Sequence, residues 1–244
     1  MRFGIIGAGT IGSIISKKLV KTGHEVKIAD ARGIGHLEGK DFAGTPVPVE
    51  NVIKDIDVLI ISLPLQALPS IRNIIEQVKE EVVIVDTSNY YPSRDDKIVE
   101  IENGMVEGVW VSNQLGRHII KAFNNILAHT LENDGTPEGT SGRIAIAIAG
   151  NDEAQKQVIM SVVNQLGFDT VDTGSLNDSW RQQPGTPAYC TKLTKEELTK
   201  ALKKANKEKA PYLRDKVMEK LSASDLPPLS HKDIINMNRE IYNS

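Results

Sequence analysis

Short apolar runs alternate with segments of helical spacing through the first two thirds of the chain. Residues 2–6 form a largely apolar run, and the apolar positions that follow at 14, 15, 19 and 20 have the spacing of one helix face. The runs at 57–63 and 82–86 are almost continuous, which is typical of strands buried on both faces of a parallel sheet. The elements predicted in this part are strands at 2–6, 25–29, 57–63 and 82–86 and a helix at 68–78.

The same alternation continues to about residue 173. Short apolar runs at 106–111 and 118–123 are followed by a strand–helix–strand unit over 143–171. Residues 133–142 are polar and rich in glycine, which predicts a mobile loop. Strands that alternate with helices in this way predict an α/β fold, a Rossmann-type doubly wound parallel sheet.

The pattern changes at Gly174. Residues 174–190 carry few apolar side chains, and three short helices are predicted after them, with a solvated face where lysines alternate with glutamates and alanines. We therefore predict a Rossmann domain at 1–173 and a C-terminal loop and small helical segment at 174–244. The residues that bound these helices are the capping box of Thr194 and Glu197, Pro211 in a first turn, the rigid break at Pro227-Pro228, and the cap Ser230 of a helix that ends near Tyr242.

The composition is that of an ordinary globular protein. The chain has 244 residues, 40% hydrophobic and 25% charged, and can bury a sizeable core. Its net charge of −3 provides no basic field for nucleic acid or an anionic membrane, and its longest apolar run, 58–65, is too short to span a bilayer. The early first strand leaves no room for a signal peptide, and the single Cys190 cannot form an internal disulfide. We expect a cytoplasmic protein that binds neither nucleic acid nor membrane.

The clearest candidate chemistry lies directly after the first strand. Gly7, Gly9 and Gly12 form a G-x-G-x-x-G sequence between a predicted strand and a predicted helix, the context in which it indicates dinucleotide binding. The first glycine makes the tight turn, the second lets the backbone approach a pyrophosphate, and the third lets the helix pack close to the strand. The N–H groups of the first helical turn, at Thr10 and Ile11, would hold the phosphates.

Two residues after the second strand bear on the choice between NAD and NADP. Asp30 lies close to the spacing expected of a carboxylate that binds the adenosine ribose 2′-hydroxyl, and such a carboxylate repels a 2′-phosphate. Arg32 argues for NADP, because a guanidinium can pair with that phosphate. The sequence leaves the preference open.

No side chains form an evident acid–base or metal constellation. The five histidines are scattered, and no Cys/His cluster has metal-ligand spacing, so no metal site is expected. The candidates for a catalytic acid are Lys121 and His129. A helix-surface position is the simpler interpretation of His129, and a ribose or phosphate contact is as good an interpretation of Lys121.

Several short motifs along the chain share the pattern of one family. They are G-A-G-T-I-G at 7–12, Arg32-Gly33, S-L-P at 62–64, S-N at 88–89, K-A-F-N at 121–124 and Q-Q-P-G-T-P-A-Y at 182–189. With them the chain resembles, nearly end to end, the NADPH:deazaflavin oxidoreductase family. That family includes bacterial dinucleotide-binding oxidoreductases and the cytoplasmic domain of six-transmembrane metalloreductases. Family members often have Asn-Ser-Arg where this chain has Asp30-Ala31-Arg32, which lacks the hydroxyl and adds a negative charge.

The resemblance implies an NAD(P)H-dependent oxidoreductase that transfers a hydride between nicotinamide and a flavin-like or deazaflavin acceptor, with ferric reductase activity through free flavin. Positioning of two stacked rings can supply most of this catalysis, so no catalytic acid is required. The acceptor would be bounded by the stretch Trp180–Tyr189. The nicotinamide would lie over residues at the ends of the middle strands, namely Ser62, Leu63, Pro64, Asn89 and Ala122.

Two other functions stay open. One is a small hydroxyacid or imine dehydrogenase that uses Lys121 as its acid, and the other is a non-enzymatic sensor of NAD(P)H. Whatever the function, a homodimer is expected, because three short C-terminal helices could hardly bury their apolar faces alone and because relatives form homodimers.

Overall fold

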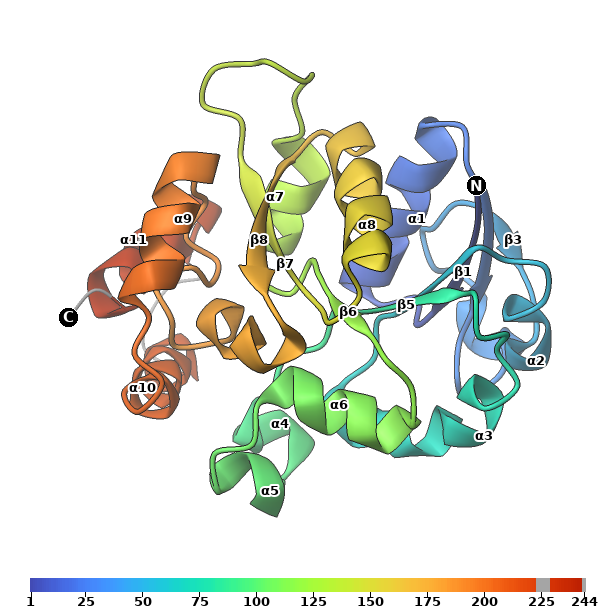
Figure 1. Cartoon of the computed structure of the whole chain (residues 1–244), viewed down its shortest axis with the longest axis horizontal. Coiled ribbons are helices and arrows are strands. Elements are labelled where there is room, and N and C mark those ends of the chain that lie inside the picture. Colours follow the sequence, from blue (N-terminus) through green and yellow to red (C-terminus); the bar gives the residue numbers. More distant parts are fainter. Residues whose placement is uncertain (223–228, 243–244) are drawn as a thin grey trace.

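The computed structural model describes residues 1–222 and 229–242, which fold around an eight-stranded sheet (Figure 1). The strand order is β3-β2-β1-β4-β5-β6-β7-β8. The strands are β1 (Arg2–Ile6), β2 (Glu25–Ala29), β3 (Thr45–Pro46), β4 (Val58–Ile61), β5 (Val83–Asp86), β6 (Ile120–Lys121), β7 (Ala145–Ala149) and β8 (Asp169–Gly174). The chain reverses its direction across the sheet between β1 and β4, which is the position where doubly wound sheets bind ligands.

Pairing is parallel throughout the sheet except between β6 and β7. Lys121 pairs with Ala149 in an antiparallel sense, so the predicted Rossmann-type fold is confirmed but its sheet is mixed rather than fully parallel. A parallel neighbouring strand requires a long crossover connection back to the opposite edge of the sheet. An antiparallel strand needs none, because it begins at the edge where the previous strand ends. The one helix between β6 and β7, α7 (Ala128–Asn133), has six residues and a length of only about 9 Å.

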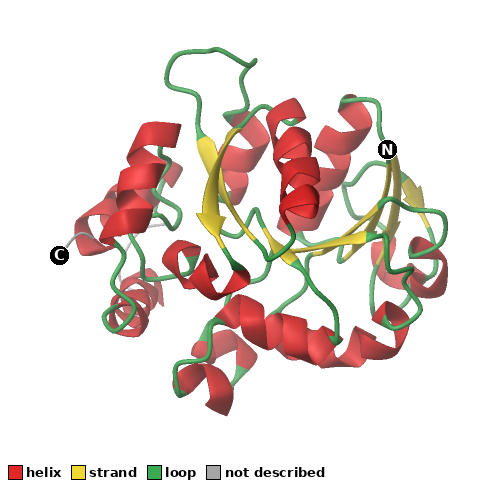
Figure 2. Cartoon of the chain, viewed as in Figure 1, coloured by secondary structure: helices red, strands yellow, loops and turns green. Residues whose placement is uncertain are grey.

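Helices cover both faces of the sheet (Figure 2). Alternate residues of the strands face opposite sides, and the two faces belong to separate apolar clusters. The helices up to β8 are α1 (Thr10–Lys21), η1 (Ile34–Leu37), α2 (Val49–Val52), η2 (Leu65–Ile71), α3 (Arg72–Ile75), α4 (Pro92–Asp95), α5 (Val99–Glu102), α6 (Glu107–Leu115), α7 and α8 (Glu153–Gln165). One cluster joins Ile5 and Ile60 to α1, α7 and α8, and the other joins Ile6 and Ile61 to η2, α3 and α6.

The apolar run at 106–111 is part of a helix, α6, and not a strand. Val111 and Leu115 lie one turn apart on its buried side, and Gly116 ends the helix with a φ of 66°. An apolar run of this length fits a buried helix as well as a buried strand, which is why the pattern alone did not separate the two.

The C-terminal segment begins with η3 (Leu176–Gln182) and continues with α9 (Lys195–Lys204), α10 (Ala210–Ser222) and α11 (His231–Tyr242). The capping box of Thr194 and Glu197 is confirmed. The helix that it starts ends at Lys204 and not near 209, because the side chain of Asn206 accepts hydrogen bonds from the backbone of Glu208 and Lys209 and begins the next turn. Pro211 lies in the first turn of α10 and Ser230 caps α11, as predicted.

The C-terminal helices bury their apolar faces within the chain. Leu198 and Leu202 of α9 pack on alanines of β7 and on Val171, while Leu213 of α10 and Ile241 of α11 share a second cluster with Tyr189. The expectation that these helices need a second subunit to bury their apolar faces is therefore wrong, and the dimer itself stays a prediction. Pro227-Pro228 lies outside the described residues, and within the described ones no helix combines the length and the apolar character that a bilayer span requires.

Candidate functional site

The predicted cofactor residues meet at one edge of the sheet. Strands β1, β2, β4, β5 and β6 are parallel, so their carboxyl ends lie along the same edge. Each predicted segment comes directly or within three residues after one of these ends. The segments are Gly7–Gly12 after β1, Asp30–Arg32 after β2, Ser62–Pro64 after β4, Asn89 after β5 and Ala122 after β6.

The glycine turn has the geometry that its motif predicts. Gly7 has a φ of +110°, and a Cβ on it would lie 2.2 Å from the carbonyl oxygen of Ser62. A Cβ on Gly12 would lie 2.0 Å from the carbonyl oxygen of Gly7, so the helix can approach its strand only with glycine there. A Cβ on Gly9 would meet nothing within 4 Å. The open face of the turn is thus at Gly9, where the motif places the pyrophosphate.

The N-terminus of α1 beside this open face has unused hydrogen-bonding capacity. Gly9 is its N-cap, no side chain caps the helix, and no acidic residue lies in its first turn. Thr10 is exposed and Ile11 is partly exposed. Free N–H groups and the positive end of the helix dipole at such a position favour a phosphate.

The carboxylate of Asp30 is neutralised by two cations from its own loop. The Arg32 guanidinium donates to both carboxylate oxygens, at 2.9 and 3.0 Å, and Lys40 Nζ lies 2.9 Å from Oδ2. Asp30 is 5% exposed, and the hydrogen bonds from Arg32 hold its pKa well below the usual range. The three side chains together carry one net positive charge, from two cations and one carboxylate.

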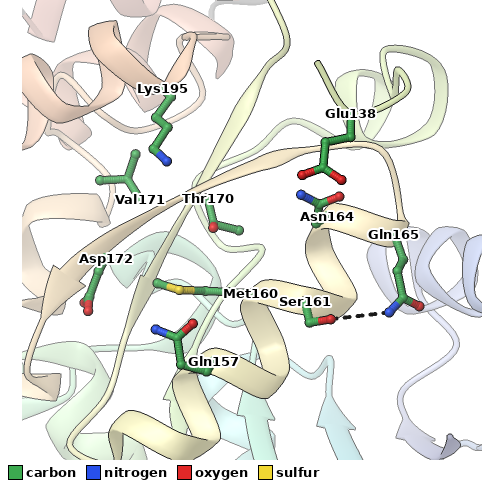
Figure 3. Close-up of a pocket in the computed structure, with 10 residues that line it drawn as sticks. All are labelled: Glu138, Gln157, Met160, Ser161, Asn164, Gln165, Thr170, Val171, Asp172 and Lys195. Carbon is green, nitrogen blue, oxygen red and sulfur yellow. Dashed lines mark hydrogen bonds between the residues drawn. The ribbon is translucent and has the colours of Figure 1, made fainter. Parts of the chain in front are cut away.

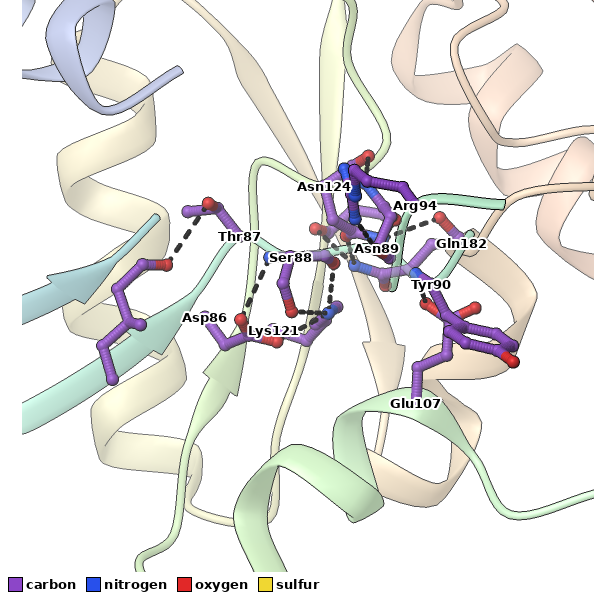
Figure 4. Close-up of polar contacts among 12 residues, drawn as sticks. Asp86, Thr87, Ser88, Asn89, Tyr90, Arg94, Glu107, Lys121, Asn124 and Gln182 are labelled. Atoms are coloured by element: carbon purple, nitrogen blue, oxygen red, sulfur yellow. Dashed lines mark hydrogen bonds and ion pairs between the residues drawn. The ribbon is translucent and has the colours of Figure 1, made fainter. Parts of the chain in front are cut away.

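An amide network connects the far end of the edge to the C-terminal segment (Figure 4). Asn89 and Asn124 exchange hydrogen bonds, with Nδ2 of Asn89 donating to the carbonyl of Asn124 at 2.9 Å and Nδ2 of Asn124 donating to Oδ1 of Asn89 at 3.1 Å. Asn124 in turn exchanges hydrogen bonds with Gln182 at 2.8 and 2.9 Å. Gln182 is fully buried. The start of the predicted acceptor stretch is thereby fixed to the ends of β5 and β6.

Lys121 is buried behind this edge and fully engaged. Its Nζ donates to Asp86 Oδ2 at 2.6 Å and to the carbonyl of Ser88 at 2.5 Å (Figure 4). Lys121 and Asp86 are 1% and 0% exposed. These contacts fasten the turn that carries Asn89 and do not present the ammonium at the open side of the edge.

Glu107 is a second buried charge beside the same turn. Its carboxylate accepts a hydrogen bond from the backbone N–H of Tyr90 at 3.0 Å, and only 2% of the residue is exposed. Burial raises the pKa of Glu107 to about 7, against the opposing attraction of Lys121. Glu107 lies at the N-terminus of α6, where the helix dipole favours a carboxylate.

The acceptor stretch is a packed structure over most of its length. Residues 184–191 are buried, and the hydroxyl of Tyr189 lies 2.5 Å from that of Tyr91, which follows β5. At its start, Trp180 is partly exposed and the guanidinium of Arg181 stacks on its ring at 4.4 Å. An acceptor could therefore meet the stretch only at its first residues.

The remaining predicted residues differ in their accessibility. Ser62, Leu63 and Asn89 are partly exposed and Pro64 is exposed, whereas Ala122 is fully buried in the core. His129 is exposed on α7, as its simpler interpretation predicted, and stacks on His231 of α11.

A hollow of about 700 Å³ lies elsewhere, between α8, β8 and the first residue of α9 (Figure 3). Its lining includes Gln157, Met160, Thr170 and Lys195, and none of the predicted cofactor residues takes part in it.

Three residues of the site were missed by sequence reasoning. They are Lys40 in the loop after η1, Glu107 at the start of α6 and Gln182 at the end of η3, and no fixed spacing links them to the glycine motif. Gln182 alone had a signal, because it begins the Q-Q-P-G-T-P-A-Y motif.

The fold and the site define the class of the protein. A strand, a glycine turn and an uncapped helix N-terminus at the switch point of a mostly parallel sheet are the features of a Rossmann-type dinucleotide-binding protein.

Comparisons with known proteins give the family. Residues 2–90 match the model of the family "NADP oxidoreductase coenzyme F420-dependent". The Escherichia coli K12 protein YjhV is 38% identical over 111 residues, which cover 46% of this chain and 80% of that protein. The F420-dependent NADP reductase of Methanocaldococcus jannaschii is 29% identical over 180 residues, which cover 69% of this chain and 74% of that enzyme. The chain belongs to this family and is an NAD(P)-dependent oxidoreductase.

A solved structure shows a similar fold. The hypothetical protein SMa0349 of Sinorhizobium meliloti superposes with a TM-score of 0.66 at 28% identity, over 80% of this chain and 96% of that one.

Proposed function

We propose that the protein uses NADP(H) and transfers a hydride between its nicotinamide and a flavin-like or deazaflavin acceptor. When bound, the nicotinamide supplies or takes the hydride. The observation that carries the cofactor choice is the state of Asp30, whose two carboxylate oxygens are both held by cations. A 2′-hydroxyl would have to compete for that carboxylate, whereas a 2′-phosphate can pair with Arg32 and Lys40.

The two cations can reach a phosphate without leaving Asp30 unpaired. The side chain of Arg32 is 65% exposed and that of Lys40 is 31% exposed, while that of Asp30 is 7% exposed. Guanidinium and ammonium groups each have more donors than one carboxylate uses. The carboxylate thus orients the two cations and leaves their outer donors for the phosphate.

The chain's other residues position the rings. Gly9, Thr10 and Ile11 would hold the pyrophosphate, and Ser62, Leu63 and Asn89 would contact the nicotinamide. The exposed part of Trp180 would bound the acceptor. Two flat rings held face to face need orientation more than a proton donor, which fits a site whose Lys121 and Glu107 are buried.

A paired titration with NADPH and NADH tests the cofactor choice. Arg32→Gln and Lys40→Gln should each weaken NADPH binding by roughly 10–100-fold and leave NADH binding nearly unchanged, since one charged contact is worth about 1.5–3 kcal/mol. Arg2→Gln is the matched control, because Arg2 forms an exposed ion pair with Asp57 at the opposite ends of the strands. Equal losses for both nucleotides would contradict the assignment.

The acceptor is tested by following NADPH oxidation with FMN, with a 5-deazaflavin and with a ferric chelate plus free flavin. Turnover with one of the flavin-type acceptors is expected. Tight NADPH binding without turnover on any of them would instead favour the sensor, and turnover on small hydroxyacids or imines would favour the dehydrogenase.

A further inference from the structure

We propose that His129, Asp134 and His231 form a binding site for a divalent transition-metal ion of the zinc, nickel and copper class. One potential ligand atom from each of the three residues lies within 4.8 Å of the other two. This site is separate from the cofactor residues at the carboxyl ends of the parallel strands, and it does not depend on the proposed reaction.

The three residues come from two helices that are far apart in sequence. His129 is the second residue of α7, Asp134 is the C-cap of the same helix, and His231 is the first residue of α11. The rings of His129 and His231 stack with centroids 4.1 Å apart and planes 25° apart. Because the ligands come from separate helices, spacing along the sequence could not reveal the cluster.

Imidazole nitrogens with one carboxylate oxygen make a donor set that these ions prefer. Zinc binds histidine nitrogen and carboxylate oxygen at roughly 2.0–2.2 Å, which puts tetrahedral ligand atoms about 3.3 Å apart. Closing the cluster from 4.8 Å requires rotation of the rings about their side-chain torsions, and the exposure of His129 leaves room for it. Two histidines and one carboxylate leave a fourth position for water, as in open zinc sites.

Two neighbouring side chains affect metal binding in opposite directions: Thr130 favours it and Lys192 opposes it. The Thr130 hydroxyl lies 3.0 Å from Nε2 of His231, so a hydrogen bond to this nitrogen can orient the ring and leave the other nitrogen for the metal ion. Lys192 Nζ lies 3.0 Å from Oδ2 of Asp134 and competes with a cation for this carboxylate. Removal of the Lys192 charge should therefore strengthen metal binding.

A bound ion would fasten the C-terminal helix to the Rossmann core. Besides its apolar packing, α11 contacts the residues that follow the acceptor stretch through Asn238, which donates to the Cys190 carbonyl, and Arg239, which donates to the Thr191 carbonyl. An ion that bridges α7 and α11 binds the folded state and so raises its melting temperature.

The test is zinc binding by the full chain without a histidine tag, measured by calorimetry and by thermal melting. We expect one ion per chain with micromolar affinity or better, and a melting temperature about 5–10 °C higher at a hundredfold excess over Kd. Cobalt should give the visible absorption of a four-coordinate site. His129→Gln and His231→Gln should each reduce zinc affinity at least about tenfold, Lys192→Gln should increase it, and the exposed-histidine control His118→Gln should not change it.

Melting of each metal-free variant establishes that it folds before zinc is added. Absence of heat and of a melting shift in the parent chain would overturn the proposal. So would unchanged affinity in folded His129→Gln and His231→Gln, which would identify the binding as adventitious.

Discussion

The buried ion pair of Lys121 and Asp86 should contribute strongly to the stability of the fold. Lys121→Met removes the ammonium 2.6 Å from Asp86 and keeps a long side chain in its place. It leaves behind a carboxylate with 0% exposure whose remaining hydrogen bond comes from the backbone N–H of Ser88 at 3.0 Å.

The expected loss of stability is large. Removal of one partner from a buried ion pair costs about 3–5 kcal/mol, because the other charge stays buried without compensation. Domains are stable by only about 5–15 kcal/mol, so the variant should have a much lower urea midpoint. The exposed pair of Arg2 and Asp57 is the control, and Arg2→Met should leave the urea midpoint nearly unchanged, because water screens an exposed ion pair.

Urea unfolding followed by tryptophan fluorescence measures both variants. The double variant Asp86→Asn/Lys121→Met separates charge from packing, since asparagine keeps the oxygen that accepts from Ser88. It should recover most of the stability that Lys121→Met loses. A double variant as unstable as the single one, or a single variant that loses less than about 1 kcal/mol, would refute the reasoning.

The Lys121→Met variant also tests the alternative function, a hydroxyacid or imine dehydrogenase with Lys121 as its acid. If folded Lys121→Met still oxidises NADPH with a flavin-type acceptor, Lys121 is not the acid of the reaction. Loss of turnover in the folded variant, with NADPH binding intact, would restore it as a candidate.

Three further predictions concern the turn and two buried groups. Gly12→Ala should destabilise the protein by about 1–3 kcal/mol and abolish tight cofactor binding. Gly9→Ala has open space around its Cβ, so it should weaken cofactor binding and leave stability unchanged. Thermal melting and nucleotide titration distinguish the two variants. The pKa of Glu107, raised by burial to about 7, means that the folded state keeps its proton to higher pH than the unfolded state, so stability should fall by roughly 3 kcal/mol between pH 4.5 and 8. Glu107→Gln should remove that decline in urea titrations, and an unchanged slope would contradict the cause. Burial also raises the pKa of Cys190 to about 12, so a disulfide reagent should modify it at pH 8 only after unfolding; rapid reaction in the native state would show that this thiol is accessible.

The sequence predicted most of what depends on neighbours along the chain. The apolar runs, the glycine turn and the caps at Thr194 and Ser230 lie where they were predicted, because each is set by a few consecutive residues. The apolar run at 106–111 did not reveal whether it forms a helix or a strand, since a short buried helix and a short buried strand share its composition.

What the tertiary structure decided are the interactions between residues that no spacing connects. Asp30 was a candidate ribose ligand in the sequence, and the fold places Arg32 and Lys40 on its carboxylate oxygens. Lys121 was a candidate acid in the sequence, and the fold pairs its ammonium with the buried Asp86. Local sequence fixes backbone conformation through short-range sterics and hydrogen bonds. Charge and its neutralisation depend on which elements pack together, and only the folded chain brings those partners within reach.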